Sequence, residues 1–166
     1  MNEESIDKEE IMKYLSILNG YHAKYSNNKN EINFVKEIND LKATFYNCFG
    51  DFYQNYNSIQ KNSKRIEYFE KAAKFGNSEA LNNLGTFYYN GDGVEQNFNK
   101  AKKYYEQSAK LGNFDALNNL GLMYFNGEGV EQDISKSMKY YEKSAKLGNS
   151  EALNRLGTFY YNGDGV

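Results

Sequence analysis

Apolar residues recur at three- and four-residue spacing in short segments that are followed by glycine. In residues 77–94, Leu81, Leu84 and Tyr88 keep this spacing, which is typical of one face of an α-helix. Asn77 precedes the segment and is a favourable N-cap, and the glycines that follow it can adopt the positive φ that ends a helix. The segment therefore predicts a helix, here named helix A, and a tight loop.

A second helical segment, named helix B, follows the loop. Its apolar and small residues share one face: Ala101, Tyr105, Ser108 and Leu111. Asn97 can cap its N-terminus, and Gly112 suits the position just after its last turn. Each unit of the chain is therefore predicted to be a pair of antiparallel helices.

The helix pair repeats with a period of 36 residues. Two sets of glycines mark the period: Gly76, Gly112 and Gly148, and Gly85, Gly121 and Gly157. Residues 149–166 repeat residues 77–94 with Arg155 in place of Asn83 as the single change, and residues 113–130 keep every glycine. The repetition predicts an all-α fold, an α/α solenoid of stacked antiparallel helix pairs with a 36-residue period.

Gly85, Gly121 and Gly157 fall inside helix A, where glycine costs about 1 kcal/mol relative to alanine. Close approach of the two helices would offset that cost, because a ring such as Tyr105 can lie directly over a position without a Cβ. We expect these glycines to be packing positions.

The repeated motif resembles the Sel-one-like repeat (SLR) family, a relative of the tetratricopeptide repeats. The matching residues, with their counterparts one period on, are Ala80, Leu81, Leu84, Gly85, Tyr88, Gly91, Gly93, Val94, Ala101, Tyr105, Ala109 and Gly112. The resemblance covers residues 63–166. It implies a non-catalytic scaffold or adaptor that assembles protein complexes, and it names no partner.

The repeat divides the chain into five regions. They are an N-terminal helical cap region (1–40), a degenerate repeat (41–76), two repeats (77–112 and 113–148), and a partial repeat with helix A and its loop (149–166). In the cap region we expect a helix to about Leu18, a loop over residues 19–30, and a second helix from about Glu31. In the degenerate repeat, a shift of 36 residues sets Cys48 against Leu84 and Phe49 against Gly85.

A solenoid of helix pairs has a concave face lined by helix A positions that point away from helix B. If the tetratricopeptide geometry holds, the candidate partner-binding residues are Asn82, Thr86, Tyr89, Asn118, Leu122, Phe125, Asn154, Thr158 and Tyr161. Asparagine offers a donor and an acceptor to a peptide backbone, and aromatic rings add contact area at low entropic cost. The expected partner is a protein or peptide, although these positions also suit solvent or contacts between repeats.

Composition and charge exclude several other functions. Net charge is −2, and residues 1–62 hold 7 Lys and Arg against 9 Asp and Glu, so no basic stripe predicts a nucleic-acid partner. The acidic N-terminus has no apolar run that could form a signal peptide or a membrane span. Cys48 is the one cysteine, which excludes an intrachain disulfide and agrees with a cytoplasmic location.

Catalysis is not expected. Some cysteine-rich members of the SLR family resemble proteins labelled β-lactamases, and Ser5-x-x-Lys8 and Ser58-x-x-Lys61 match one motif of such hydrolases. The partner motifs Ser-Asp-Asn and Lys-Thr-Gly are absent, so a β-lactamase-like hydrolase is a minor alternative. His22 and Cys48 are single residues of their kinds, and Cys48 is expected as a buried, inert core thiol. No metal or cofactor is expected, because these residues cannot build a zinc site.

Two further interpretations remain open. Val166 follows a helix A without its helix B, which is what a fragment of a longer array or multidomain protein would show. Alternatively, the protein is a self-associating structural array, in which apolar residues at the open C-terminal end, such as Leu153 or Leu156, contact a second copy.

Overall fold

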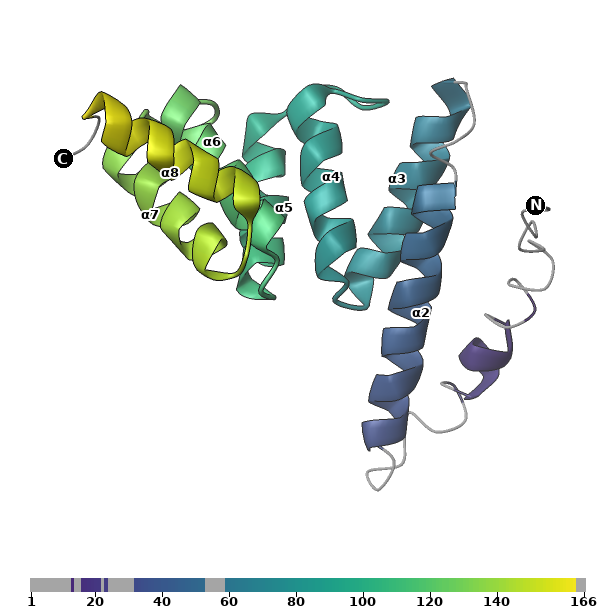
Figure 1. The fold of residues 1–166 in the computed structure, drawn as a ribbon. Coiled ribbons are helices and arrows are strands. Elements are labelled where there is room, and N and C mark those ends of the chain that lie inside the picture. Colours follow the sequence, from purple (N-terminus) through teal and green to yellow (C-terminus); the bar gives the residue numbers. More distant parts are fainter. Residues whose placement is uncertain (1–12, 14–15, 22, 24–31, 53–58, 164–166) are drawn as a thin grey trace, which may run out of the picture.

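The computed structural model describes residues 13, 16–21, 23, 32–52 and 59–163. Residues 16–21 are helical, and the remaining elements are α2 (Ile32–Phe52), α3 (Ile59–Lys74), α4 (Ser78–Asn90), α5 (Phe98–Lys110), α6 (Phe114–Asn126), α7 (Ile134–Lys146) and α8 (Ser150–Asn162). No strand occurs among the described residues. Consecutive helices pack against one another from α2 at one end of a curved stack to α8 at the other (Figure 1). The predicted all-α solenoid is confirmed.

The A helices of the repeats are α4, α6 and α8, and the B helices are α5 and α7. Each A helix begins at an asparagine whose side-chain oxygen accepts a hydrogen bond from the backbone N–H three residues on: Asn77, Asn113 and Asn149, at 2.8, 2.9 and 2.8 Å. Asn97 and Asp133 cap the B helices in the same way. Gly91, Gly127 and Gly163 end the A helices with φ near +75°, the left-handed conformation that glycine adopts without strain.

The glycines inside α4 and α6 lie under tyrosine rings, as expected. A Cβ on Gly85 would lie 2.5 Å from the ring of Tyr105, and one on Gly121 would lie 2.7 Å from the ring of Tyr141. Both rings are almost fully buried, so each glycine–tyrosine contact stands at the centre of its helix pair. The expectation is wrong for Gly157 in α8, because no described atom lies within 4 Å of the Cβ position there.

Upstream of the repeats, the predicted register is wrong by one residue. Gly50, not Phe49, lies under the ring of Phe69, and Phe69 is 36 residues before Tyr105 whereas Gly50 is 35 before Gly85. The stretch between Gly50 and Phe69 is therefore one residue shorter than the matching stretch in the repeats. Cys48 consequently aligns with Asn83 instead of Leu84, and it is exposed instead of buried.

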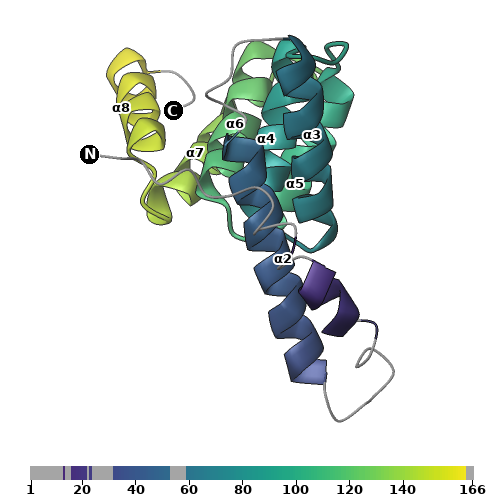
Figure 2. The ribbon, with the colours of Figure 1, turned by 90° about the vertical axis from the view of Figure 1, so that its right-hand side faces the viewer.

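The N-terminal part of the fold also departs from expectation. Residues 19–21 and 23 are helical, so the expected loop over residues 19–30 is wrong at its start, and residues 24–30 lie outside the described part. Helix α2 is longer than the A helices, and its N-terminal half projects beyond the rest of the stack (Figure 2). Helix α2 runs without a break through residues 40 and 41, where the cap region and the degenerate repeat were expected to meet.

Candidate protein-binding surface

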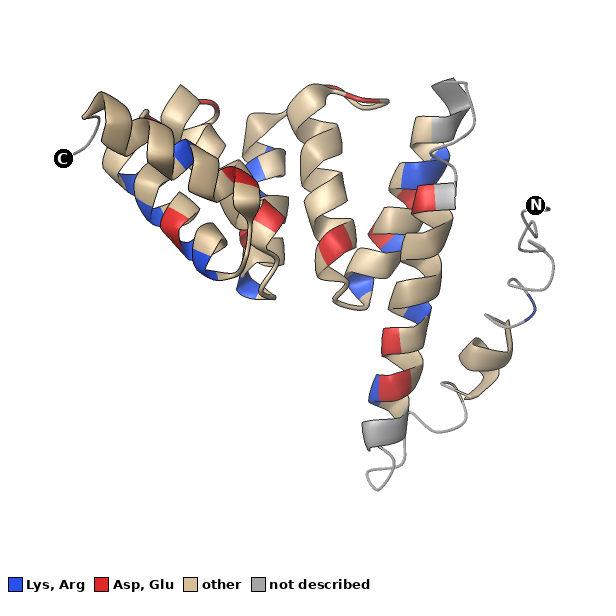
Figure 3. Cartoon of the chain, viewed as in Figure 1, with Lys and Arg blue, Asp and Glu red and all other residues tan. Residues whose placement is uncertain are grey.

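Charge is distributed unequally between the two kinds of helix. Helices α4 and α6 carry one charged residue each, Glu79 and Asp115, both in the first turn. Helices α5 and α7 carry four lysines and one glutamate each. Helices α4 and α6 are consequently uncharged beyond their first turn, whereas α8 carries Arg155 in addition to Glu151 (Figure 3). A partner that contacts α4 or α6 meets mainly amides, hydroxyls and rings.

In the first full repeat, the candidate residues bond to other parts of the stack. Asn82 Oδ1 accepts a hydrogen bond from Asn119 Nδ2 on α6 at 3.0 Å. The Thr86 hydroxyl lies 3.2 Å from the hydroxyl of Tyr105. These side chains are half-buried. The Asn82–Asn119 hydrogen bond joins one repeat to the next, and the Thr86–Tyr105 contact joins the two helices of one repeat.

Tyr89 completes this set of internal contacts. Its hydroxyl donates a hydrogen bond of 2.5 Å to Glu128 Oε2, in the loop after α6, and its ring meets the edge of Phe98. Burial, followed by the Glu128 hydrogen bond, raises the pKa of Tyr89 to about 12. Tyr89 therefore links its repeat to the next one through a hydroxyl that stays neutral.

The second and third repeats present the candidate residues differently. Asn118 is 5% exposed, so its side chain is not offered on the surface, and Leu122 is half-buried. The exposed candidates are Phe125, Asn154, Thr158 and Tyr161. Tyr161 is 91% exposed and Phe125 is 37% exposed. The accessible part of the predicted surface thus lies toward α8.

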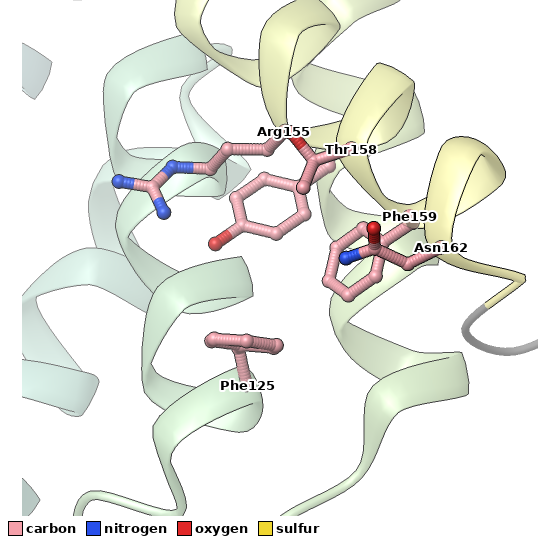
Figure 4. A pocket seen from close by; sticks show the side chains of 6 residues that line it. Phe125, Arg155, Thr158, Phe159 and Asn162 are labelled. Carbon is pink, nitrogen blue, oxygen red and sulfur yellow. The ribbon is translucent and has the colours of Figure 1, made fainter.

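A hollow of about 180 Å³ opens between α6, α7 and α8. It is lined by Phe125, Tyr141, Arg155, Thr158, Phe159 and Asn162. Figure 4 shows Phe125 approaching from α6 while Arg155, Thr158, Phe159 and Asn162 approach from α8. The hollow brings together two of the predicted residues, Phe125 and Thr158.

The other four lining residues were missed by sequence reasoning. One signal pointed to them, because Arg155 is the single difference between residues 149–166 and residues 77–94. Arg155 Nη2 donates to Glu151 Oε1 at 2.7 Å, and the guanidinium carbon lies 5.7 Å from the ring centroid of Tyr141. The rings of Phe125 and Phe159 meet edge to face with centroids 5.4 Å apart.

The Tyr141 hydroxyl is buried, and no group meets it at hydrogen-bonding geometry. Burial raises the pKa of Tyr141, and the positive charge of Arg155, with the hydrogen-bonding groups of Ser137 and Arg155 that lie near the hydroxyl, opposes that rise. Ser137 donates its own hydroxyl to the carbonyl of Gly121 at 2.7 Å. Tyr141 therefore borders the hollow as a neutral phenol that can either donate or accept a hydrogen bond.

The described residues show no group that suggests metal or thiol chemistry. None of them forms a set of three or more His, Cys, Asp or Glu side chains that could hold a metal ion. Partial burial, together with the negative charges of Asp51 and Glu79, raises the pKa of Cys48, which keeps it a thiol at neutral pH. The remaining residues of the hydrolase and thiol alternatives, Ser5, Lys8, His22 and Ser58, lie outside the described part, as does the side chain of Lys61.

None of the helices in the described part of the chain combines the length and apolar character needed to cross a bilayer.

The fold and its repeating caps define a class, the α/α solenoid of short antiparallel helix pairs. The Sel1 repeat model matches residues 66–77, 78–113, 114–149 and 150–166. The chain therefore belongs to the Sel1 repeat family, whose members generally act as non-catalytic scaffolds for protein interactions.

Solved structures of similar fold come from several bacteria. A Sel1 repeat protein from Oxalobacter formigenes is 27% identical with a TM-score of 0.67, over 75% of this chain and 50% of that one. The protective antigen c5321 of uropathogenic Escherichia coli, which displays an SLR fold, is 27% identical with a TM-score of 0.69, over 93% of this chain and 35% of that one. Helicobacter pylori cysteine rich protein B is 25% identical with a TM-score of 0.55, over 74% of this chain and 97% of that one.

The chain thus spans half of the Oxalobacter protein and about a third of the E. coli antigen. No curated protein matches the chain at a significant level.

Proposed function

We propose that this protein is a cytoplasmic scaffold that binds a peptide segment of a protein partner along the A helices, chiefly at the end formed by α6 and α8. The observation that carries the proposal is the exposed aromatic surface there, with Phe125 37% and Tyr161 91% exposed, on which the one cation of α8, Arg155, is paired with Glu151. Monomeric proteins rarely leave clusters of large apolar residues exposed without an interaction to use them.

The chemistry of this surface favours an extended or loosely folded segment over a charged ligand. Asn154 and Thr158 supply hydrogen-bonding groups to a peptide backbone, and aromatic rings provide area at low entropic cost. The internal contacts of Asn82, Thr86 and Tyr89 assign the first repeat a supporting role, because those side chains already bond within the stack.

The test is a selection of binders from a random peptide display library against the whole chain, followed by anisotropy titration of the selected peptides. Tyr161→Ala and Phe125→Ala should weaken binding about tenfold or more, in line with the loss of an aromatic anchor. Tyr160→Ala is the matched control, because Tyr160 is also exposed, at 57%, and lies next to Tyr161 on α8. Equal loss in all three variants, or none in any, would reject this surface as the binding site.

Self-association is a second candidate, and α8 carries the observation that favours it. Leu153 is 56% exposed, whereas its counterpart Leu117 in α6 is 8% exposed. Leu156, expected at the same open end, is instead 9% exposed and belongs to the core with Tyr141. Sedimentation velocity tests this candidate: a dimer that dissociates in Leu153→Glu supports it, and a monomer at all concentrations rejects it.

A further inference from the structure

We infer that the hollow between α6, α7 and α8 is a site for one aromatic side chain that carries a polar group at its far end, such as a tyrosine of a peptide partner. The inference rests on the proposed function, and it adds the chemistry of the residue that is recognised. This interface and the preceding one have the same backbone and different side chains, and the polar groups of the two differ in their hydrogen bonding.

At the preceding interface, between α4, α5 and α6, the corresponding polar groups bond to one another. The hydroxyls of Thr86 and Tyr105 lie 3.2 Å apart, and Asn119 donates to Asn82 at 3.0 Å. The interface therefore satisfies its own hydrogen-bonding groups.

At the interface between α6, α7 and α8, two substitutions remove both of these pairs. Leu122 stands at the position of Thr86, so the Tyr141 hydroxyl lacks the partner that Tyr105 has, and no other group bonds to it at normal hydrogen-bond geometry. Arg155 stands at the position of Asn119 and bonds to Glu151 instead, so Asn118 Oδ1 also has no partner. Buried polar atoms without partners destabilise a fold, and their presence in pairs at one interface calls for an explanation. A ligand that bonds to the Tyr141 hydroxyl supplies one.

The size and lining of the hollow favour a ring. A cavity of roughly 150 Å³ lined by apolar side chains accepts benzene, and this hollow measures about 180 Å³. Phe125 and Phe159 already pack edge to face there, an arrangement that a third ring can extend. Arg155 beside the Tyr141 ring adds a cation that can interact with the face of an aromatic ligand.

A carboxylate is a poorer fit than a phenol. The positive charge of Arg155 is already paired with Glu151, and three of the six lining residues are aromatic. A phenol hydroxyl can both donate to and accept from the Tyr141 hydroxyl, whereas an unsubstituted ring would leave that group without a partner.

The probes for the test are p-cresol, toluene and butyrate, which carry the side-chain chemistry of tyrosine, phenylalanine and glutamate. Each is titrated against the whole chain while the NMR signals of Phe125 and Phe159 are followed. We expect saturable shifts with p-cresol at millimolar concentration, binding of toluene weaker by about fivefold for the loss of one hydrogen bond, and no saturable shift with butyrate. Butyrate binding more tightly than p-cresol would overturn the inference, as would equal binding of p-cresol and toluene.

Two variants test the role of the Tyr141 hydroxyl. Tyr141→Phe removes it, and Leu122→Thr restores the partner that Tyr105 has in Thr86; both should abolish the preference for p-cresol while retaining toluene binding. Tyr105→Phe is the control and should keep the preference, because that hydroxyl lies at the other interface. An unchanged preference in both test variants would overturn the inference.

This result can be separated from the proposed function. If selected peptides lose affinity on Tyr161→Ala while p-cresol binds nowhere near Phe159, the scaffold function stands and the hollow is not its subsite. If p-cresol binds as expected while no peptide is selected, the hollow is a site and peptide binding along the A helices is wrong.

Discussion

Two three-helix interfaces in this protein, one of α4, α5 and α6 and the other of α6, α7 and α8, share a backbone and differ in how their polar groups are used. Tyr105 and Tyr141 occupy equivalent positions, each over a glycine and each at most 2% exposed. The Tyr105 hydroxyl has Thr86 as a partner, whereas the Tyr141 hydroxyl has none. The first interface thus pairs its own polar side chains, and the second leaves a hollow.

The difference separates two roles that a repeat protein combines in one motif. The glycine, the tyrosine over it and the helix caps are the same in both interfaces, so they determine the stack. Positions 86 and 122, and 119 and 155, vary between repeats while the backbone stays the same. Local departures from an otherwise consistent pattern are where function is expected.

The largest effect should come from the glycines themselves. Gly121→Ala places a methyl group 2.7 Å from the Tyr141 ring and should lower the free energy of unfolding by about 1–3 kcal/mol through overpacking. Gly157→Ala meets nothing within 4 Å and should raise it by about 1 kcal/mol through helix propensity. Urea unfolding followed by circular dichroism measures both. The same sign of change in the two variants would show that the ring contact does not control this position.

Alkaline unfolding should reveal the buried tyrosine of the first interface. Burial raises the pKa of Tyr105 from 10.0 to about 12, and the Thr86 hydrogen bond opposes this rise. Below about pH 10 the hydroxyl is neutral in both states; between pH 10 and 12 only the unfolded chain loses the proton, so stability falls as the pH rises.

The ionisation of Tyr105 should lower the free energy of unfolding by roughly 2 kcal/mol between pH 10 and 12. Unfolding curves at pH 7 and at pH 11.5 should therefore differ less for Tyr105→Phe than for the wild type. An equal difference in the two proteins would contradict the raised pKa.

A smaller effect should distinguish the two tyrosine hydroxyls. Tyr105→Phe breaks a hydrogen bond with Thr86 and should cost about 1 kcal/mol of unfolding free energy. Tyr141→Phe removes a buried hydroxyl without a partner and should be neutral or stabilising. Parallel urea titrations at neutral pH compare the two. A cost at Tyr141 as large as that at Tyr105 would mean that its hydroxyl is bonded in solution.

The sequence predicted features that depend on neighbouring residues in the chain. Asn77, Asn113 and Asn149 cap helices as expected, because an N-cap acts on a backbone N–H three residues away. The spacing of Gly85 and Gly121 correctly predicted rings above them, because the same helix pair recurs around both.

Features that depend on the third dimension were harder to predict. The register upstream failed because the stretch from Gly50 to Phe69, which lacks the glycine landmarks of the repeats, is one residue shorter. The hollow was missed because it requires residues of three helices, and neither Leu122 nor Arg155 is unusual alone. Their effect is seen only in the folded protein, where the Tyr141 hydroxyl and Asn118 Oδ1 lack hydrogen bonds of normal geometry.

We expect Leu122 to be the residue that leaves the Tyr141 hydroxyl free for a ligand, and a double-mutant cycle between these two positions tests this most directly. Unfolding free energies are measured for the wild type, Leu122→Thr, Tyr141→Phe and the double variant. We predict a favourable coupling of about 1 kcal/mol between the hydroxyl introduced by Leu122→Thr and the Tyr141 hydroxyl, equal to one hydrogen bond. A coupling indistinguishable from zero would contradict this expectation, because the Tyr141 hydroxyl would then form no hydrogen bond with a hydroxyl at position 122.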